Sequence, residues 1–186
     1  YIGIGTEDDD KSGIWLWPAK EKQLPTRCTT AGLVNAAAFA PDGKTVVTGS
    51  ANHALQAWDS FTGKELTNKS VAAGPVEAVA VSDDGQTVAT GTDNGKVQLW
   101  KADSLLPVGF ELEVPQLKSD TGKVRKVAFA LGGTRLLALI QDEQQGIGDV
   151  PVWDTTNGCF LENLNNTPWE IKAVAISRDG RRVLNA

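Results

Sequence analysis

Residues 34–59 decide the fold, and their sequence is VNAAAFAPDGKTVVTGSANHALQAWD. The same pattern returns in residues 76–100, VEAVAVSDDGQTVATGTDNGKVQLW, and in residues 124–154, VRKVAFALGGTRLLALIQDEQQGIGDVPVWD. A further copy begins with IKAVAISRDG at residues 171–180, and a partial copy opens the chain with GIWLWP at residues 13–18. Repetition of this kind predicts a repeat architecture in which each copy forms one structural unit.

The spacing of tryptophans measures the period of the repeat. Trp17 and Trp58 are 41 residues apart and Trp58 and Trp100 are 42 apart, which fits the roughly 40–45 residues of a unit built from four strands. Trp100 and Trp153 are 53 apart. Gly133 precedes Trp153 by 20 residues, against 15 for the matching glycines of the two earlier copies. Five of the extra residues therefore fall between the second and third expected strands, and the rest before the first.

Each copy has the pattern of four short strands. A strand of small and β-branched residues leads to a turn such as Pro41-Asp42-Gly43 or Asp83-Asp84-Gly85, whose glycine supplies the positive φ that a tight hairpin needs. A nearly continuous apolar strand follows, and then an alternating strand that ends in tryptophan. A turn then leads to an edge strand that begins at Glu65-Leu66 in the first full copy. No stretch has helical periodicity, so the sequence predicts an all-β fold.

These residues resemble the WD40 family of β-propellers, and the resemblance covers essentially the whole chain. The motifs that carry it are the Phe39–Gly43 turn block, Gly49-Ser50, Gly91-Thr92, Trp58-Asp59 and Trp153-Asp154. The Gly-His pair that often precedes the first strand in this family is absent from every copy. The resemblance therefore implies that the family's buried Asp-His-Ser/Thr-Trp hydrogen-bond set does not form, and that cohesion comes mainly from packing.

The resemblance implies a β-propeller of four-stranded WD40-type blades, with about four blades present as a partial ring or half-propeller. We expect one WD40 segment over residues 1–186, with units near 1–30 (partial), 31–72, 73–118, 119–166 and 167–186 (partial). An open arc leaves an apolar sheet face in water, so three arrangements stay open. The chain is a segment of a longer propeller, a half-ring that pairs with another copy, or a self-closed four-blade ring. The first residue is Tyr1 and methionine is absent, which favours a processed chain or a stretch of a longer one.

Charge and composition exclude several classes of function. Lys and Arg number 18 and Asp and Glu number 23, for a net charge of −5, which argues against nucleic-acid binding. No apolar run reaches the roughly 18 residues of a membrane-spanning helix, so we expect no membrane insertion. Cys28 and Cys159 are too few for a disulfide framework and have no metal-ligand spacing, and low cysteine use favours the cytoplasm. His53 is the single histidine and is expected in a turn, so we predict no catalytic residues, no metal site and no cofactor.

Loops of variable length define the predicted binding surface. In the family, the loops that join second to third strands and fourth to next-first strands share one face, and the length variation of this chain collects there. The acidity of these loops predicts a partner protein with a basic contact surface. Two additional tryptophans are candidate interface anchors. The candidate residues are Glu7, Asp8, Asp9, Asp10, Trp15, Asp142, Glu143, Asp149 and Trp169.

Two functions from different classes are compatible with these features. The first is a noncatalytic protein–protein interaction scaffold that presents a propeller face within a larger protein or assembly, with self-association to complete the ring as a further partner hypothesis. The alternative is the propeller portion of a larger enzyme or regulatory sensor whose catalytic residues lie outside this chain. Fold alone does not separate these functions, because propellers also host enzymes.

Overall fold

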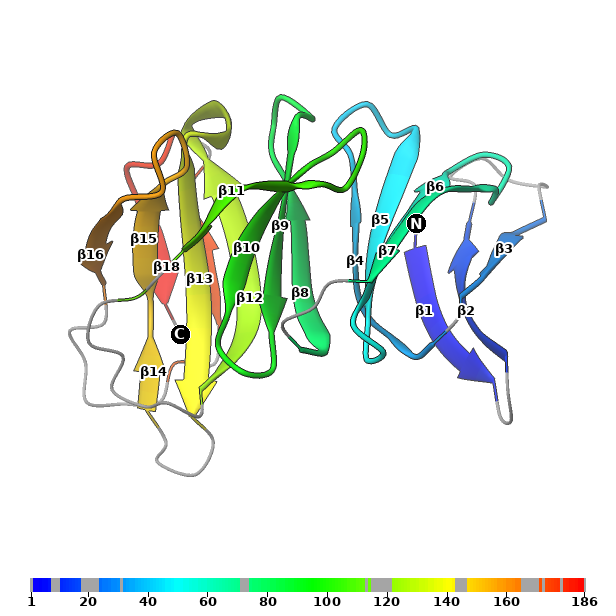
Figure 1. Cartoon of the computed structure of the whole chain (residues 1–186), viewed down its shortest axis with the longest axis horizontal. Helices are drawn as coiled ribbons and strands as arrows, with labels where there is room; N and C mark the ends of the chain where they lie inside the picture. Colours follow the sequence, from blue (N-terminus) through cyan, green and yellow to red (C-terminus); the bar gives the residue numbers. More distant parts are fainter. Residues whose placement is uncertain are drawn as a thin grey trace.

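Antiparallel β-sheets account for nearly all of the regular structure. The computed structural model describes residues 2–7, 11–17, 24–30, 32–70, 74–112, 114, 122–142, 147–164, 171, 173–177 and 179–185. Within these residues the strands form five sheets, accompanied by a 3₁₀ turn at Leu131–Gly133. Figure 1 shows the sheets following one another in sequence order, from the blue end of the chain to the red end. The prediction of an all-β partial propeller with about four blades is confirmed.

The strands of each sheet are consecutive in the chain. The first sheet contains β1 (Ile2–Glu7), β2 (Lys11–Leu16) and β3 (Thr26–Thr29). The second contains β4 (Val34–Phe39), β5 (Thr45–Ser50), β6 (Ala54–Asp59) and β7 (Glu65–Ser70). The third contains β8 (Val76–Val81), β9 (Thr87–Thr92), β10 (Val97–Lys101) and β11 (Pro107–Leu112). The fourth contains β12 (Lys123–Ala130), β13 (Arg135–Asp142), β14 (Ile147–Asp149), β15 (Pro151–Asp154) and β16 (Phe160–Asn163), and the fifth β17 (Val174–Ile176) and β18 (Val183–Asn185).

The turn between the first and second strands has the geometry that the sequence predicts. Gly43 and Gly85 have φ angles of 68° and 71°, a region that side-chain-bearing residues rarely adopt. Asp42 Oδ1 accepts a hydrogen bond from the Lys44 backbone nitrogen at 2.9 Å, and Asp84 Oδ1 accepts one from the Gln86 nitrogen at 3.0 Å. The aspartate and the glycine of each motif therefore stabilise the turn together.

A bulge recurs near the start of the first strand in each of the second, third and fourth sheets. It shifts the register between Val34 and Ala36 in β4, and at the equivalent positions of β8 and β12. The bulged residue Asn35 donates from Nδ2 to the Val76 carbonyl oxygen at 3.2 Å and to Glu77 Oε1 at 3.1 Å. This bulge consequently links one sheet to the next through polar contacts.

The tryptophan one residue before the end of the third strand packs against the preceding sheet. Trp58 joins a buried cluster with Ile14 and Leu16 of β2, and Trp100 joins one with Leu55 and Ala57 of β6. Trp153 likewise packs with residues of the third sheet. These three tryptophans are 2%, 8% and 0% exposed. The core of the molecule therefore lies between successive sheets, and each sheet needs its neighbour to bury its apolar face.

Two glycines set how closely the sheets approach. A Cβ added at Gly49 of β5 would lie 2.3 Å from Val76 Cγ1, and a Cβ added at Gly91 of β9 would lie 2.2 Å from Val124 Cγ1. Both valines belong to the first strand of the following sheet. The Gly-Ser and Gly-Thr pairs of the repeat thus provide the space into which the next sheet packs.

Buried hydrogen bonds supplement this packing in two of the sheets. The Trp58 indole Nε1 donates to Thr48 Oγ1 at 2.9 Å, and the Trp100 Nε1 donates to Thr90 Oγ1 at 2.8 Å. Ala138 occupies the corresponding register position in the fourth sheet and has no hydroxyl group. The expectation that packing alone provides most of the cohesion is therefore incomplete, because the Thr–Trp portion of the family's hydrogen-bond set is present without the histidine.

We predict that Gly91→Ala will destabilise the fold by about 1–3 kcal/mol, because the added methyl group must displace Val124 at the well-packed interface between the third and fourth sheets. Urea denaturation followed by tryptophan fluorescence measures the change. Gly148→Ala is the matched control, because the nearest atom to a Cβ at Gly148 is Ile171 Cβ at an ordinary 3.6 Å. Equal stability of the two variants would contradict the proposed role of Gly91.

We predict that Thr90→Val will destabilise the fold by about 1–3 kcal/mol, because the substitution removes the acceptor of the buried Trp100 indole while preserving side-chain shape. The same urea titration measures this change. Thr67→Val, in the edge strand β7, is the control and should alter stability little. A Thr90→Val variant as stable as the wild type would mean that the hydrogen bond contributes nothing.

Candidate protein-binding surface

The hairpin turns of successive sheets gather at one end of the strands, along the upper edge in Figure 1. They comprise the turns between the first and second strands and those between the third and fourth strands. We call this end the turn face. The C-terminal ends of β1 and β13 lie at the opposite end.

A hollow of about 510 Å³ opens on the turn face between the second and third sheets. Three turns contribute carboxylates to its lining, from Asp42, Asp84 and Asp103. Apolar side chains, including Val47 and Val81, form another part of the lining. We call this feature the acidic hollow. It combines an apolar wall with negative charge, which suits the long aliphatic stem and cationic head of a lysine or arginine side chain.

Local hydrogen bonds keep one of these carboxylates ionised. Ser82 Oγ donates to Asp84 Oδ1 at 2.5 Å, and together with the Gln86 backbone nitrogen it lowers the pKa of Asp84 below its ordinary value. Asp103 is exposed in the turn between β10 and β11. The acidic hollow is therefore negatively charged at neutral pH.

The aspartates that follow the repeated tryptophans cap turns on the same face. Asp59 Oδ1 accepts hydrogen bonds from the Thr62 nitrogen at 2.7 Å, the Thr62 hydroxyl at 2.8 Å and the Phe61 nitrogen at 3.0 Å. These bonds, those from Thr62 above all, lower the pKa of Asp59. Asp154 makes the equivalent bonds to Thr156 and also accepts from Arg135 at 2.7 Å. The aspartate of the Trp-Asp motif thus stabilises the turn that follows it.

Two of the predicted contact residues are buried. Asp142 is 4% exposed and Asp149 is 3% exposed. The insertion between β13 and β15 forms β14, which pairs with β13 and holds both aspartates in a ladder. Asn163 Nδ2 donates to Asp149 Oδ1 at 2.7 Å. The expectation that these carboxylates lie on an exposed acidic loop is therefore wrong, because the additional residues extend the sheet.

The other predicted contact residues are placed only in part. Trp15 is half-buried in β2, and the Arg27 guanidinium carbon lies 5.6 Å from the centre of its ring, within the range of a cation–π contact. Glu7 ends β1 and pairs in register with Lys11. Five predicted contact residues lie outside the described residues: Asp8, Asp9, Asp10, Glu143 and Trp169. The structure does not bring the described members of the predicted set together into one site.

Sequence analysis did not identify the acidic hollow. The motifs at Asp42 and Asp84 indicate hairpin turns, which is correct, but nothing in the sequence indicates that neighbouring turns and Asp103 enclose a shared hollow. The only available signal was the recurrence of Asp at equivalent turns of adjacent repeats.

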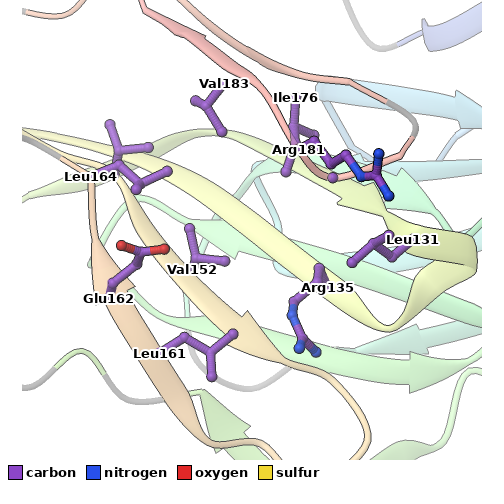
Figure 2. A pocket seen from close by; sticks show the side chains of 11 residues that line it. Leu131, Arg135, Val152, Leu161, Glu162, Leu164, Ile176, Arg181 and Val183 are labelled. Carbon is purple, nitrogen blue, oxygen red and sulfur yellow. The ribbon is translucent and has the colours of Figure 1, made fainter.

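A second hollow of about 410 Å³ lies between the fourth and fifth sheets. Figure 2 shows Val152, Leu161 and Leu164 on one side of it and Ile176, Arg181 and Val183 on the other. We call it the end groove. Among its apolar lining residues, Val150 and Val152 are buried, whereas Leu161 is exposed.

Comparison with known proteins identifies the repeat. Residues 22–59 and 64–101 match the family model of the WD domain, G-beta repeat. These stretches include β3 to β6 and β7 to β10, and they confirm the resemblance to WD40 repeats deduced from the sequence. Repeats of this family generally mediate protein–protein interactions and are typically noncatalytic. A comparison with curated proteins found no match.

Two other kinds of feature are absent from the described part of the chain. No helix there has the length and apolar character needed to cross a membrane. No group of three or more His, Cys, Asp and Glu side chains in the same part of the chain is arranged to hold a metal ion.

We predict that Asp59→Asn will weaken the dependence of stability on acidic pH. The pKa of Asp59 is lower in the folded state than in the unfolded state, so its ionisation stabilises the fold above pH ~4. That contribution is lost as the pH falls through the lowered pKa. Urea midpoints measured from neutral pH into the acidic range test this prediction. The wild type should lose more stability than Asp59→Asn, Thr62→Val should be intermediate, and identical profiles would contradict the capping role.

Proposed function

We propose that this chain is a noncatalytic scaffold that binds a protein partner through its turn face. The observation that carries the proposal is the acidic hollow, in which three carboxylates surround an apolar wall between two WD40 repeats. Concave sites with apolar walls and a few convergent polar groups are the usual form of a binding pocket. The charge of the acidic hollow favours a partner with a basic contact surface.

Binding of a basic partner to the acidic hollow should depend on salt concentration. A cationic side chain in the acidic hollow would meet Asp42 and Asp103 near solvent, so the attraction is weakened by salt. Exposed ion pairs contribute up to about 1 kcal/mol, and charge complementarity acts strongly on the association rate. The partner of this proposal therefore presents arginine or lysine together with an apolar residue.

Two further parts of the proposal concern assembly and location. We propose that copies of the chain associate, which is supported by the exposed apolar side chains of Phe61 and Leu66. We also propose a cytoplasmic location, supported by two cysteines that are both free thiols, one of which is exposed.

We predict that a fluorescent peptide rich in arginine and leucine will bind the chain, and that a peptide with glutamine in place of each arginine will not. Fluorescence anisotropy measures both affinities. Asp103→Asn and Asp42→Asn should each weaken binding about two- to fivefold, because each removes one charge from the acidic hollow.

Asp83→Asn is the matched control for these variants. Asp83 is exposed in the turn beside Asp84 but does not line the acidic hollow, so the control removes the same charge from the same face. Binding that weakens equally in Asp83→Asn would indicate general charge attraction and contradict a specific site. Absence of binding by the arginine peptide would also contradict the proposal.

A further inference from the structure

The turn between β6 and β7 presents a phenylalanine to solvent. Phe61 is 73% exposed and lies three residues after the repeated tryptophan of its sheet. The residues at the same position in the third and fourth sheets are Asp103 and Thr156, which are polar and exposed. The hairpin therefore does not require an apolar side chain here, and turn geometry does not account for an aromatic residue at position 61.

Hydrogen bonds hold the turn that carries Phe61 in one conformation. Asp59 Oδ1 accepts a hydrogen bond from the Phe61 backbone nitrogen at 3.0 Å. The Ser60 backbone nitrogen donates to the Lys44 carbonyl oxygen at 2.8 Å, and Ser60 Oγ donates to the Gly43 carbonyl oxygen at 2.6 Å. These bonds attach the turn to the neighbouring β4–β5 turn. A side chain on a turn held in this way loses little backbone freedom on binding, which favours Phe61 as an interface residue.

Apolar side chains of two sheets gather around this turn. Thr26 Oγ1 donates to the Phe61 carbonyl oxygen at 3.5 Å, and a Cβ added at Gly63 would lie 2.6 Å from Thr26 Cγ2, so the turn contacts the start of β3 (Figure 1). Leu24, two residues before β3, is 89% exposed, and Leu66 near the start of β7 is 53% exposed. We call Leu24, Phe61 and Leu66 the rim patch. Exposed apolar patches of this kind mark interaction sites.

The charges beside the rim patch are complementary to themselves. Lys64 and Glu65 are consecutive, exposed and opposite in charge, and neither forms an ion pair within the part of the chain that the structure describes. A twofold contact uses the same surface on both copies. An axis that passes close to this pair places Lys64 of each copy opposite Glu65 of the other, which is favourable. The acidic hollow, whose charges have one sign, would repel its own copy.

We propose that the rim patches of two copies of this chain meet about a twofold axis, with Phe61 of each copy against Leu66 of the other and Lys64 of each copy beside Glu65 of the other. The contact specifies the self-association of the proposed function and rests on it. The residues that line the acidic hollow are not part of the rim patch, so each copy in the dimer still presents a site for a basic partner.

Light scattering coupled to size exclusion, over a concentration series, tests the contact. We expect the full chain to reach a mass of twice 19.7 kDa at high concentration and no larger species, because a twofold contact is closed. Phe61→Thr introduces the residue type found at position 156, so the hairpin should tolerate it. This variant should associate about thirtyfold more weakly or less, because each dimer loses two aromatic interface residues.

Leu106→Thr is the matched control for Phe61→Thr. Leu106 is 50% exposed and lies in the corresponding turn of the third sheet, between β10 and β11, outside the rim patch. This variant loses a similar exposed apolar side chain and should associate like the wild type. Circular dichroism of each variant separates loss of contact from loss of fold.

Charge reversal tests the twofold geometry. Lys64→Glu and Glu65→Lys should each weaken association about tenfold, because charges of the same sign then meet across the axis. An equimolar mixture of the two variants should regain association, because the two negative charges of one variant meet the two positive charges of the other. Glu65 Oε2 also accepts a hydrogen bond from Gln56 Nε2 at 2.9 Å, so the urea midpoint of each variant is measured. If Glu65→Lys loses the fold, the comparison of Phe61→Thr with Leu106→Thr decides alone.

The outcomes separate this contact from the rest of the proposed function. A wild type that is monomeric at every concentration would overturn both self-association and the contact. Association that persists in Phe61→Thr, equal weakening in Leu106→Thr, or a folded charge-reversal mixture that shows no recovery would overturn the contact alone. Binding of the arginine peptide by Phe61→Thr tests the acidic hollow independently, and it should match that of the wild type.

Discussion

Close packing between successive sheets is the constraint on which the rest of the structure depends. Each sheet has an apolar face that only its neighbour covers, and the close approach requires glycine at positions 49 and 91, opposite Val76 and Val124. The third-strand tryptophans pack at the same interfaces between sheets. Because these contacts involve adjacent sheets alone, the stability of the array is a sum of contributions from successive sheet-to-sheet interfaces, as in other repeat proteins.

The interfaces between adjacent sheets also explain where the acidic hollow and the end groove form. Adjacent sheets bring hairpin turns from different repeats together, and the acidic hollow forms where the turns of Asp42, Asp84 and Asp103 meet. The end groove forms at the interface between the fourth sheet and the fifth, of which two strands are described. Both features are products of sheet-to-sheet spacing, and neither belongs to a single repeat. The polar turns and the apolar groove thereby give the chain two chemically different surfaces.

Sequence reasoning succeeded where the signal is local and repeated. Gly43 and Gly85 adopt the positive φ that their hairpins require, and the third strands of the second, third and fourth sheets end one residue after their tryptophans. It failed where an insertion departs from the pattern of the repeat. Asp142 and Asp149 follow the pattern of an acidic loop but are buried, because β14 pairs with β13. It also underestimated Thr48 and Thr90, whose hydroxyl groups accept the tryptophan indoles.

The sequence by itself determined the all-β class, the WD40 repeat and the positions of the hairpin turns, because period, turn residues and strand alternation are properties of neighbouring residues. The tertiary structure decided which carboxylates are exposed and which turns share a hollow. The shared hollow depends on the distances between residues more than forty positions apart, such as Asp42 and Asp84. Such distances are fixed only when the sheets pack against one another.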